Sequence, residues 1–119
     1  MFLNAQIEQL FNNFTVGNVR IPVNYMTYQG HGEPYITYMQ FDANASFSAD
    51  DKLSGYVTYY DFDIYAKSNY LAIAAAVIDV LETAGWTWQV GRSSQDMYEA
   101  DTGYFHKTLC FAIEVERGF

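Results

Sequence analysis

The chain is poor in cysteine and in positive charge, and both shortages exclude classes of protein. Its 119 residues include one cysteine, Cys110, and only 6 lysines and arginines against 14 aspartates and glutamates. A single cysteine cannot form an internal disulfide, so the sequence suits a reducing compartment. The formal net charge of −8 argues against binding a nucleic-acid backbone or an anionic membrane, because both attract clustered lysine and arginine.

Long apolar runs and a basic N-terminal flank are also missing. No run approaches the roughly 18 residues needed to span a bilayer. The first residues include Gln6 and Glu8 and no basic residue, which is unlike a secretion signal. Hydrophobic residues nevertheless make up 50% of the chain and aromatic residues 18%, a composition that excludes disorder. We therefore expect one acidic cytoplasmic domain over residues 1–119.

Two aromatic-rich segments predict a long β-hairpin. The first begins at Pro34–Tyr38 and continues to Phe47, and the second covers Tyr56–Tyr65. Aromatic and β-branched residues favour a pleated, half-buried surface, and the polar segment 48–55 between them supplies turn formers. So many tyrosines on one hairpin indicate contact with another molecule. The expected contact residues at its tip are Phe47, Ser48, Ala49, Asp50, Asp51 and Lys52.

Two amphipathic helices are predicted on either side of this hairpin. The first has about three turns and one apolar stripe, made by Leu3, Ile7, Leu10, Phe11 and Phe14. The second is expected from about Asn69 to Ala84, capped by Ser68 and ended by Gly85.

Three further strands complete the predicted fold. They are Val19–Tyr25, which Pro22 limits to an edge or a strand start, Trp86–Val90, and Tyr104–Glu116. In the last strand Leu109, Phe111, Ile113 and Val115 share one face. The element order predicts an α+β fold, in which two helices pack on one face of an antiparallel sheet with a long β-hairpin.

The residue types that most often carry chemistry lack partners in the sequence. His31 lies between two glycines, and the only other histidine, His106, falls on a predicted strand far along the chain. A catalytic or metal-binding function needs neighbours that these positions do not supply, so an interface or structural loop is favoured for His31. Cys110 is surrounded by strand residues, which indicates a buried, unreactive thiol.

Asp61 and Asp63 lie two residues apart on a strand, so their side chains share one face. Paired carboxylates can perform acid–base chemistry or bind a cation. Since Tyr60, Phe62 and Ile64 on the other face resemble core, we interpret the pair as a solvated or subunit-facing acidic edge.

A calcium loop is a second possible use of the acidic residues, but the EF-hand spacing is absent. The residues concerned are Asp96, Glu99 and Asp101, with Asp50 and Asp51. A phosphate-binding glycine loop, a zinc cysteine pair and a nucleophile elbow are absent as well. The sequence therefore predicts a protein that is not an enzyme and that needs no cofactor and no metal.

Several segments in a fixed order carry a resemblance to a known family. They are Pro34–Tyr38, Phe47–Lys52, Asp61–Tyr65, the helix ending Asp79–Glu82, and Tyr98–Lys107. Together they resemble the small tail-completion, or tail-terminator, proteins of long-tailed bacteriophages, which are also described as minor capsid or head–tail joining proteins. The resemblance covers roughly Pro34 to Glu116 and depends on the order and spacing of the segments.

The resemblance implies a structural role in the virion. Members of that family close the tail tube as a ring, commonly a hexamer, and offer a surface to the head connector. The implied partners are further copies of the chain, the tail tube protein and the neck proteins. The implied locations are the virion tail or neck and, during synthesis, the host cytoplasm. Subunit or partner contacts are expected at the hairpin tip and at Asp61, Asp63, Tyr98 and Glu99.

A second hypothesis remains open beside the ring subunit. The same acidic, tyrosine-rich composition fits a small soluble protein-binding module of the immunity type, because tyrosine, tryptophan and methionine are enriched at interfaces in general. Mass in solution distinguishes the two: rings or concentration-dependent oligomers favour the first, and a strict monomer favours the second.

Overall fold

The computed structural model describes residues 2–27, 32, 34–49, 52–93 and 96–116, and it has an α+β fold with a mostly antiparallel sheet. The helices are α1 (Phe2–Leu10), α2 (Tyr70–Thr83) and a short 3₁₀ helix, η1 (Val90–Arg92). The strands are β1 (Thr15–Val16), β2 (Val19–Arg20), β3 (Val23–Tyr25), β4 (Tyr35–Ala49), β5 (Lys52–Ala66), β6 (Thr87–Trp88), β7 (Met97–Glu99) and β8 (Tyr104–Glu116).

The main sheet has the strand order β3-β4-β5-β8-β6, and β7 pairs with part of β8. Strand β3 runs parallel to β4, and all the other pairs of this sheet are antiparallel. Strands β1 and β2 form a separate small hairpin. The predicted long hairpin and the predicted last strand, Tyr104–Glu116, are therefore confirmed.

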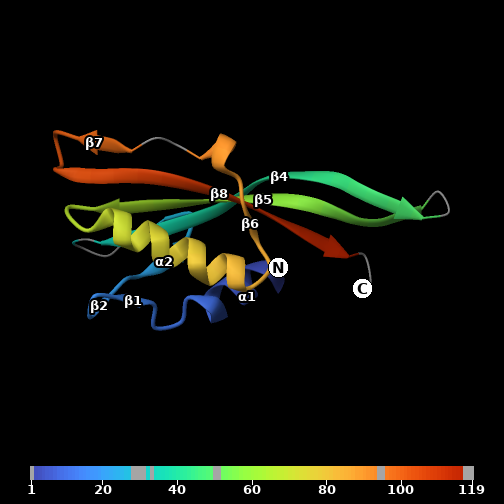
Figure 1. Cartoon of the computed structure of the whole chain (residues 1–119), viewed down its shortest axis with the longest axis horizontal. Helices are drawn as coiled ribbons and strands as arrows, with labels where there is room; N and C mark the ends of the chain where they lie inside the picture. Colours follow the sequence, from blue (N-terminus) through green and yellow to red (C-terminus); the bar gives the residue numbers. More distant parts are fainter. Residues whose placement is uncertain (1, 28–31, 33, 50–51, 94–95, 117–119) are drawn as a thin grey trace.

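The long hairpin extends beyond the rest of the sheet. Strand β8 pairs with β5 only as far as Gly55, which is opposite Glu116, whereas β4 and β5 remain paired up to Ala49 and Lys52. The molecule is accordingly elongated, with extents of 53 × 27 × 24 Å. Figure 1 shows the hairpin projecting from the body, at the end opposite β7.

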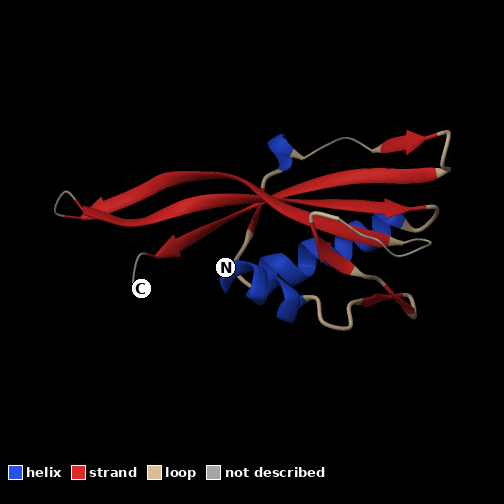
Figure 2. Cartoon of the chain, turned by 180° about the vertical axis from the view of Figure 1, so that it is seen from behind, coloured by secondary structure: helices blue, strands red, loops and turns tan. Residues whose placement is uncertain are grey.

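Both α-helices and the β1–β2 hairpin lie on the same side of the sheet, as Figures 1 and 2 show from opposite directions. The core between these layers is apolar and largely aromatic. Its fully buried members include Ile7, Ile36, Tyr60, Phe62, Ile64, Val77, Leu81, Leu109 and Phe111. The rings of Phe62 and Phe111 meet edge to face at 5.8 Å. The face predicted for the last strand is thus confirmed, because Leu109, Phe111 and Val115 lie in this core and Ile113 packs against it.

The helix ends match the sequence prediction only in part. Helix α1 stops at Leu10, because Asn13 takes a left-handed conformation (φ 58°) that turns the chain, although Phe14 beyond the turn is still buried. The N-cap residue of α2 is Asn69 (φ 63°), and its side chain makes no capping hydrogen bond. The prediction that Ser68 caps the helix is wrong, because Ser68 lies one residue too early. The stop at Gly85, with φ 96°, is confirmed.

Two predicted strands are shorter than expected. Pro22 separates Val19–Tyr25 into β2 and β3, because proline has no N–H to contribute to a ladder. Strand β6 contains only Thr87 and Trp88 of the predicted segment Trp86–Val90, and residues 90–92 form η1 instead. The short strands β1 and β7 were not predicted at all.

Candidate functional site

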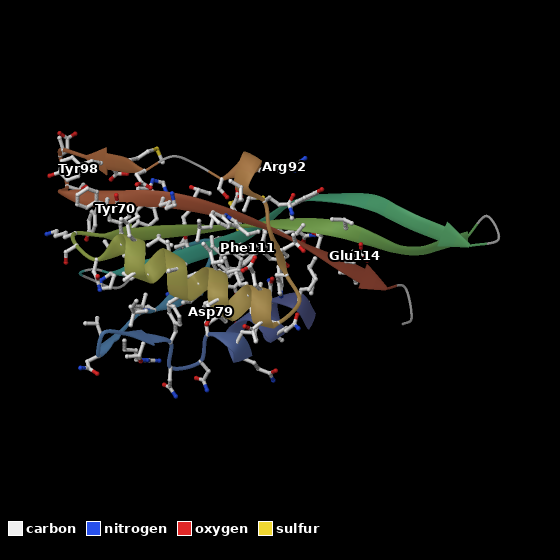
Figure 3. All side chains as sticks on the ribbon, viewed as in Figure 1. Tyr70, Asp79, Arg92, Tyr98, Phe111 and Glu114 are labelled. Atoms are coloured by element: carbon white, nitrogen blue, oxygen red, sulfur yellow. The ribbon has the colours of Figure 1, made fainter. Side chains whose placement is uncertain are left out.

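One face of the sheet carries neither α1 nor α2, and we call it the helix-free face, although the short 3₁₀ helix η1 contacts it through Arg92 (Figures 1 and 3). Successive side chains of a strand point to opposite sides, so the residues that alternate with the core of β4, β5 and β8 line it. They are Tyr35, Thr37, Met39, Val57, Tyr59, Asp61, Asp63, Tyr65, Tyr104, His106, Thr108, Cys110, Ala112 and Glu114. Most of these residues are half-buried.

A row of stacked rings crosses this face from β4 to β8. The rings of Tyr35 and Tyr65 stack at 4.8 Å, and those of Tyr65 and His106 at 4.3 Å, with interplanar angles of 17° and 18°. Tyr104 meets Tyr35 edge to face, and the Lys67 ammonium lies 5.6 Å from the centre of the Tyr104 ring. Burial, together with the nearby Asp63, raises the pKa of Tyr65 to about 12. The tyrosine is therefore a neutral hydrogen-bonding group at ordinary pH.

His106 lies between two carboxylates, which sequence reasoning did not anticipate. Its Nε2 is 3.3 Å from Asp63 Oδ1, and its Nδ1 is 3.8 Å from Glu99 Oε2 on β7. Asp63 also accepts a hydrogen bond of 2.5 Å from the Thr108 hydroxyl. Because that hydroxyl donates its hydrogen bond to the carboxylate, it is not placed as a nucleophile that the imidazole could activate as a base. The cluster links β5, β7 and β8 without the geometry of a hydrolytic triad.

Asp61 is the neighbour of Asp63 on the same face of β5, two residues earlier in the chain, and lies opposite Cys110. Burial, reinforced by the charge of Asp63, raises the pKa of the Asp61 carboxyl. Burial and the Asp61 charge raise the pKa of the Cys110 thiol to about 11. A thiol with such a pKa is protonated at neutral pH, so Cys110 lacks the character of a catalytic cysteine. Its backbone N–H donates to the Ser93 hydroxyl at 3.0 Å.

The interpretation of Asp61 and Asp63 as an acidic edge is wrong, because β5 lies between β4 and β8. An edge strand would have one free side, whereas each of these residues has a partner on both sides: Met39 and Cys110 for Asp61, and Thr37 and Thr108 for Asp63. The two carboxylates therefore stand in the middle of the helix-free face. Their predicted contact with another subunit stays a prediction.

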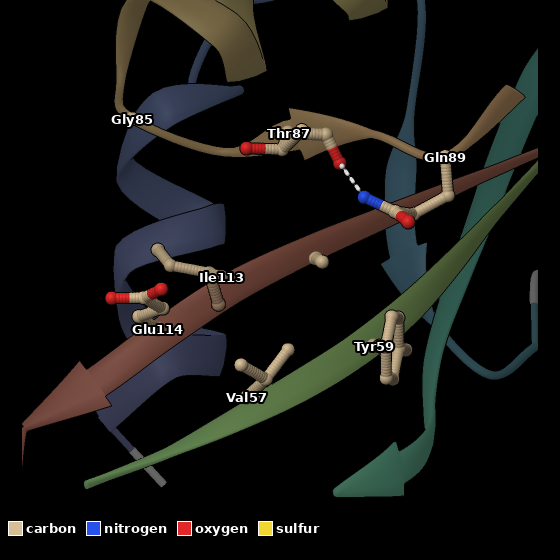
Figure 4. Close-up of a pocket in the computed structure, with 8 residues that line it drawn as sticks. Val57, Tyr59, Gly85, Thr87, Gln89, Ile113 and Glu114 are labelled. Atoms are coloured by element: carbon tan, nitrogen blue, oxygen red, sulfur yellow. Dashed lines mark hydrogen bonds between the residues drawn. The ribbon is translucent and has the colours of Figure 1, made fainter. Parts of the chain in front are cut away.

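A shallow hollow of about 470 Å³ lies toward the hairpin end of this face (Figure 4). Its lining includes Val57, Tyr59, Thr87, Gln89, Ala112 and Glu114. The Gln89 side chain donates to the Thr87 carbonyl at 3.2 Å. The Arg92 guanidinium stacks 4.2 Å from the centre of the Tyr59 ring. The lining offers a single carboxylate, Glu114, which suits contact with another molecule better than proton-transfer chemistry.

The remaining predicted contact residues lie at the two ends of the molecule. Tyr98 on β7 is 60% exposed and contacts the ring of Phe105, while its neighbour Glu99 belongs to the His106 cluster. The structure thus joins Asp63 and Glu99 through His106 and leaves Tyr98 outside this group. At the hairpin tip Phe47, Ser48, Ala49 and Lys52 lie in the paired strands. The predictions for His31, Asp50 and Asp51 fall outside the described residues.

The described part of the chain shows no cluster of three or more histidine, cysteine or acidic side chains placed to hold a metal ion. Within the same residues, no helix is both long enough and apolar enough to cross a bilayer.

No protein-family model matches the chain, and no curated protein gives a significant match to its sequence.

Proposed function

We propose that this chain is a non-enzymatic structural subunit of the tail or neck of a long-tailed bacteriophage. In this role it ends the tail tube as a ring and joins the tube to the head connector. The observation that carries the proposal is the long hairpin, whose last residues extend past β8 and away from the body (Figure 1). The ordered resemblance of Pro34–Glu116 to tail-completion proteins supports the same role.

A protruding hairpin suits ring assembly for a geometric reason. Subunits that associate head to tail around a ring use two different patches, so neither patch has to be complementary to itself. The tip, residues 47–53, can supply one patch, and the body of the next subunit can supply the other. Loops and tips on a rigid scaffold commonly carry such contacts.

The chemistry of the described residues supports a structural role as well. The histidine is held between Asp63 and Glu99, and the cysteine is buried with a raised pKa. Neither group adjoins the hollow of about 470 Å³ as a matched acid and base.

The test replaces Ala49–Lys52 by a short Gly-Ser link. Because β4 and β5 remain paired from Tyr35↔Tyr65 to Ser48↔Leu53, we expect a cooperatively folded protein with an unchanged circular dichroism spectrum. The variant should fail to form rings, or fail to support the joining of tails to heads in a complementation assay. A control replaces the exposed turn Gly17–Asn18 of the β1–β2 hairpin, which lies outside the segments of the resemblance, by Gly-Gly. Normal yields of joined, infectious particles from the tip variant would contradict the proposal.

The helix-free face keeps one alternative function in view, a small acidic protein-binding module. It offers half-buried tyrosines and carboxylates without any need for a ring. Native mass spectrometry over a range of concentrations separates the two functions. Higher oligomers support the ring subunit, and a strict monomer that binds one soluble protein supports the module.

A further inference from the structure

We propose that the helix-free face docks an extended basic segment of another protein, with arginines at alternate positions. This inference deepens the proposed function by stating the chemistry of a partner, and it relies on that function only for its biological setting. The docking surface is the middle and hairpin end of the face: Met39, Tyr59, Asp61, Asp63, Glu114 and the adjoining hollow.

The charge of the helix-free face determines the sign of the charge that a partner must carry. Asp61, Asp63 and Glu114 lie on it, while Arg92 contacts Tyr59 from η1 and Lys67 lies over Tyr104 at the far end. The whole chain has a formal net charge of −8, so two copies brought together by this face repel each other. Nucleic acids are repelled for the same reason. A basic protein surface is attracted, and complementary charge raises the rate and the specificity of such an encounter.

The spacing of the carboxylates matches an extended arginine-containing segment. Asp61 and Asp63 occupy positions i and i+2 of β5, so about 7 Å of strand separates them on one face. An extended partner places its own alternate side chains at the same interval. An arginine is favoured over a lysine, because its planar guanidinium binds a carboxylate in a bidentate manner and stacks on aromatic rings.

The face already binds guanidinium and ammonium groups of the chain itself. Arg92 stacks at 4.2 Å on Tyr59, beside the hollow, and the charge of Arg92 acts on Asp61. At the other end of the face, Lys67 lies over Tyr104. The hollow of about 470 Å³ between Val57, Thr87 and Ala112 leaves room next to Tyr59 for the apolar stem of an incoming side chain.

The experiment compares two short arginine peptides of the same composition and different order with an acidic control peptide. A peptide with the central sequence Arg-Leu-Arg, one with Leu-Arg-Arg, and one with Glu-Leu-Glu are titrated into the isotopically labelled chain. Binding is followed by the NMR shifts of the backbone amides. We expect Arg-Leu-Arg to bind several-fold tighter than Leu-Arg-Arg, with shifts concentrated on β5 and β8. Equal affinity of the two arginine peptides, or shifts spread over the surface, would overturn the inference.

A charge-matched pair of variants locates the binding site. The double variant Asp61→Asn with Glu114→Gln removes two charges from the helix-free face. The control, Asp79→Asn with Glu82→Gln, removes two exposed charges from α2; Figure 3 labels Asp79 and Glu114 on the two layers. We expect the first variant to bind Arg-Leu-Arg about tenfold more weakly and the control to bind like the unmodified chain. Equal weakening in both variants would show general electrostatic attraction only.

A second pair of variants tests the same site by adding a positive charge at exposed positions, where the fold should be kept. Met39 is 38% exposed on the helix-free face, and Leu71 is 60% exposed on α2. Met39→Arg should abolish binding of Arg-Leu-Arg by placing a like charge beside Asp61, whereas Leu71→Arg should leave it unchanged. Both variants should keep the amide spectrum of a folded protein. If Met39→Arg still binds, the inference fails. This outcome is independent of particle assembly, which tests the proposed function separately.

Discussion

Two buried tyrosine hydroxyls differ in their hydrogen bonding, so removing each of them tests a different environment. Tyr60 is fully buried, and its hydroxyl donates a hydrogen bond of 2.9 Å to the Asn4 side chain. Tyr38 is 1% exposed, and its hydroxyl has no hydrogen-bond partner among the described residues. Burial, with the nearby charges of Glu8 and Tyr25, raises the pKa of Tyr38 to about 12. The Tyr38 hydroxyl is therefore neutral at pH 7.

Tyr60→Phe and Tyr38→Phe should change the free energy of unfolding in opposite directions. Loss of the Tyr60–Asn4 hydrogen bond should lower it by about 1 kcal/mol, whereas removing an unsatisfied buried hydroxyl should raise it by about 1 kcal/mol. The two variants should therefore differ by about 2 kcal/mol. The aromatic ring and nearly all of the apolar contact area are kept in both, so the difference reports the hydroxyl group.

Equilibrium unfolding in urea, followed by tryptophan fluorescence, measures this difference. The ring of the buried Trp86 lies 5.5 Å from that of Tyr60, which makes it a suitable reporter. The slope of the free energy against urea concentration should be unchanged, so that the shift of the midpoint reports stability alone. If Tyr38→Phe lowers stability as much as Tyr60→Phe does, the Tyr38 hydroxyl has a bonding partner in solution and the reasoning is refuted.

Three further predictions concern the core and the titrating groups. Phe111→Ala and Leu81→Ala should each lower the free energy of unfolding by about 2–5 kcal/mol, because both residues are fully buried. In the same denaturation assay the control Val90→Ala, at a 65% exposed site, should lower it by less than about 0.5 kcal/mol. Asp61→Asn should stabilise the fold at pH 7 by less than about 1 kcal/mol, since the site is half-exposed and screened. The raised pKa of Asp61 means that the folded state binds its proton more tightly. The stability that protonated Asp61 contributes to the fold is present below its ordinary pKa of 3.8 and is lost as the pH rises through the folded pKa. The stabilisation by Asp61→Asn should therefore vanish in thermal melts near pH 3. Cys110, with a pKa of about 11 and no exposed surface, should react with a thiol reagent at pH 8 only as fast as the protein unfolds, and rapid labelling of folded protein would contradict its burial.

The sequence by itself determined the elements whose pattern is local. Alternation of apolar and polar residues set the bounds of β8 and its buried face, including Phe111 and Leu109. The two aromatic segments determined the long hairpin, and Gly85 determined the end of α2. These features depend on neighbours one to four residues away, which a single sequence displays directly.

Only the tertiary structure decided which residues of the helix-free face meet. Thr108 lies beside Asp63, although the two are 45 positions apart in the chain, and His106 lies 43 positions from the same carboxylate. Because β5 lies between β4 and β8, the two carboxylates are at the centre of the sheet and not at the edge that the sequence predicted. Strand order and register arise from packing the whole core, and a shift of one residue would exchange the two faces of a strand. The local pattern therefore specified the long strands β4, β5 and β8, and the cooperative packing of the whole core specified the surface.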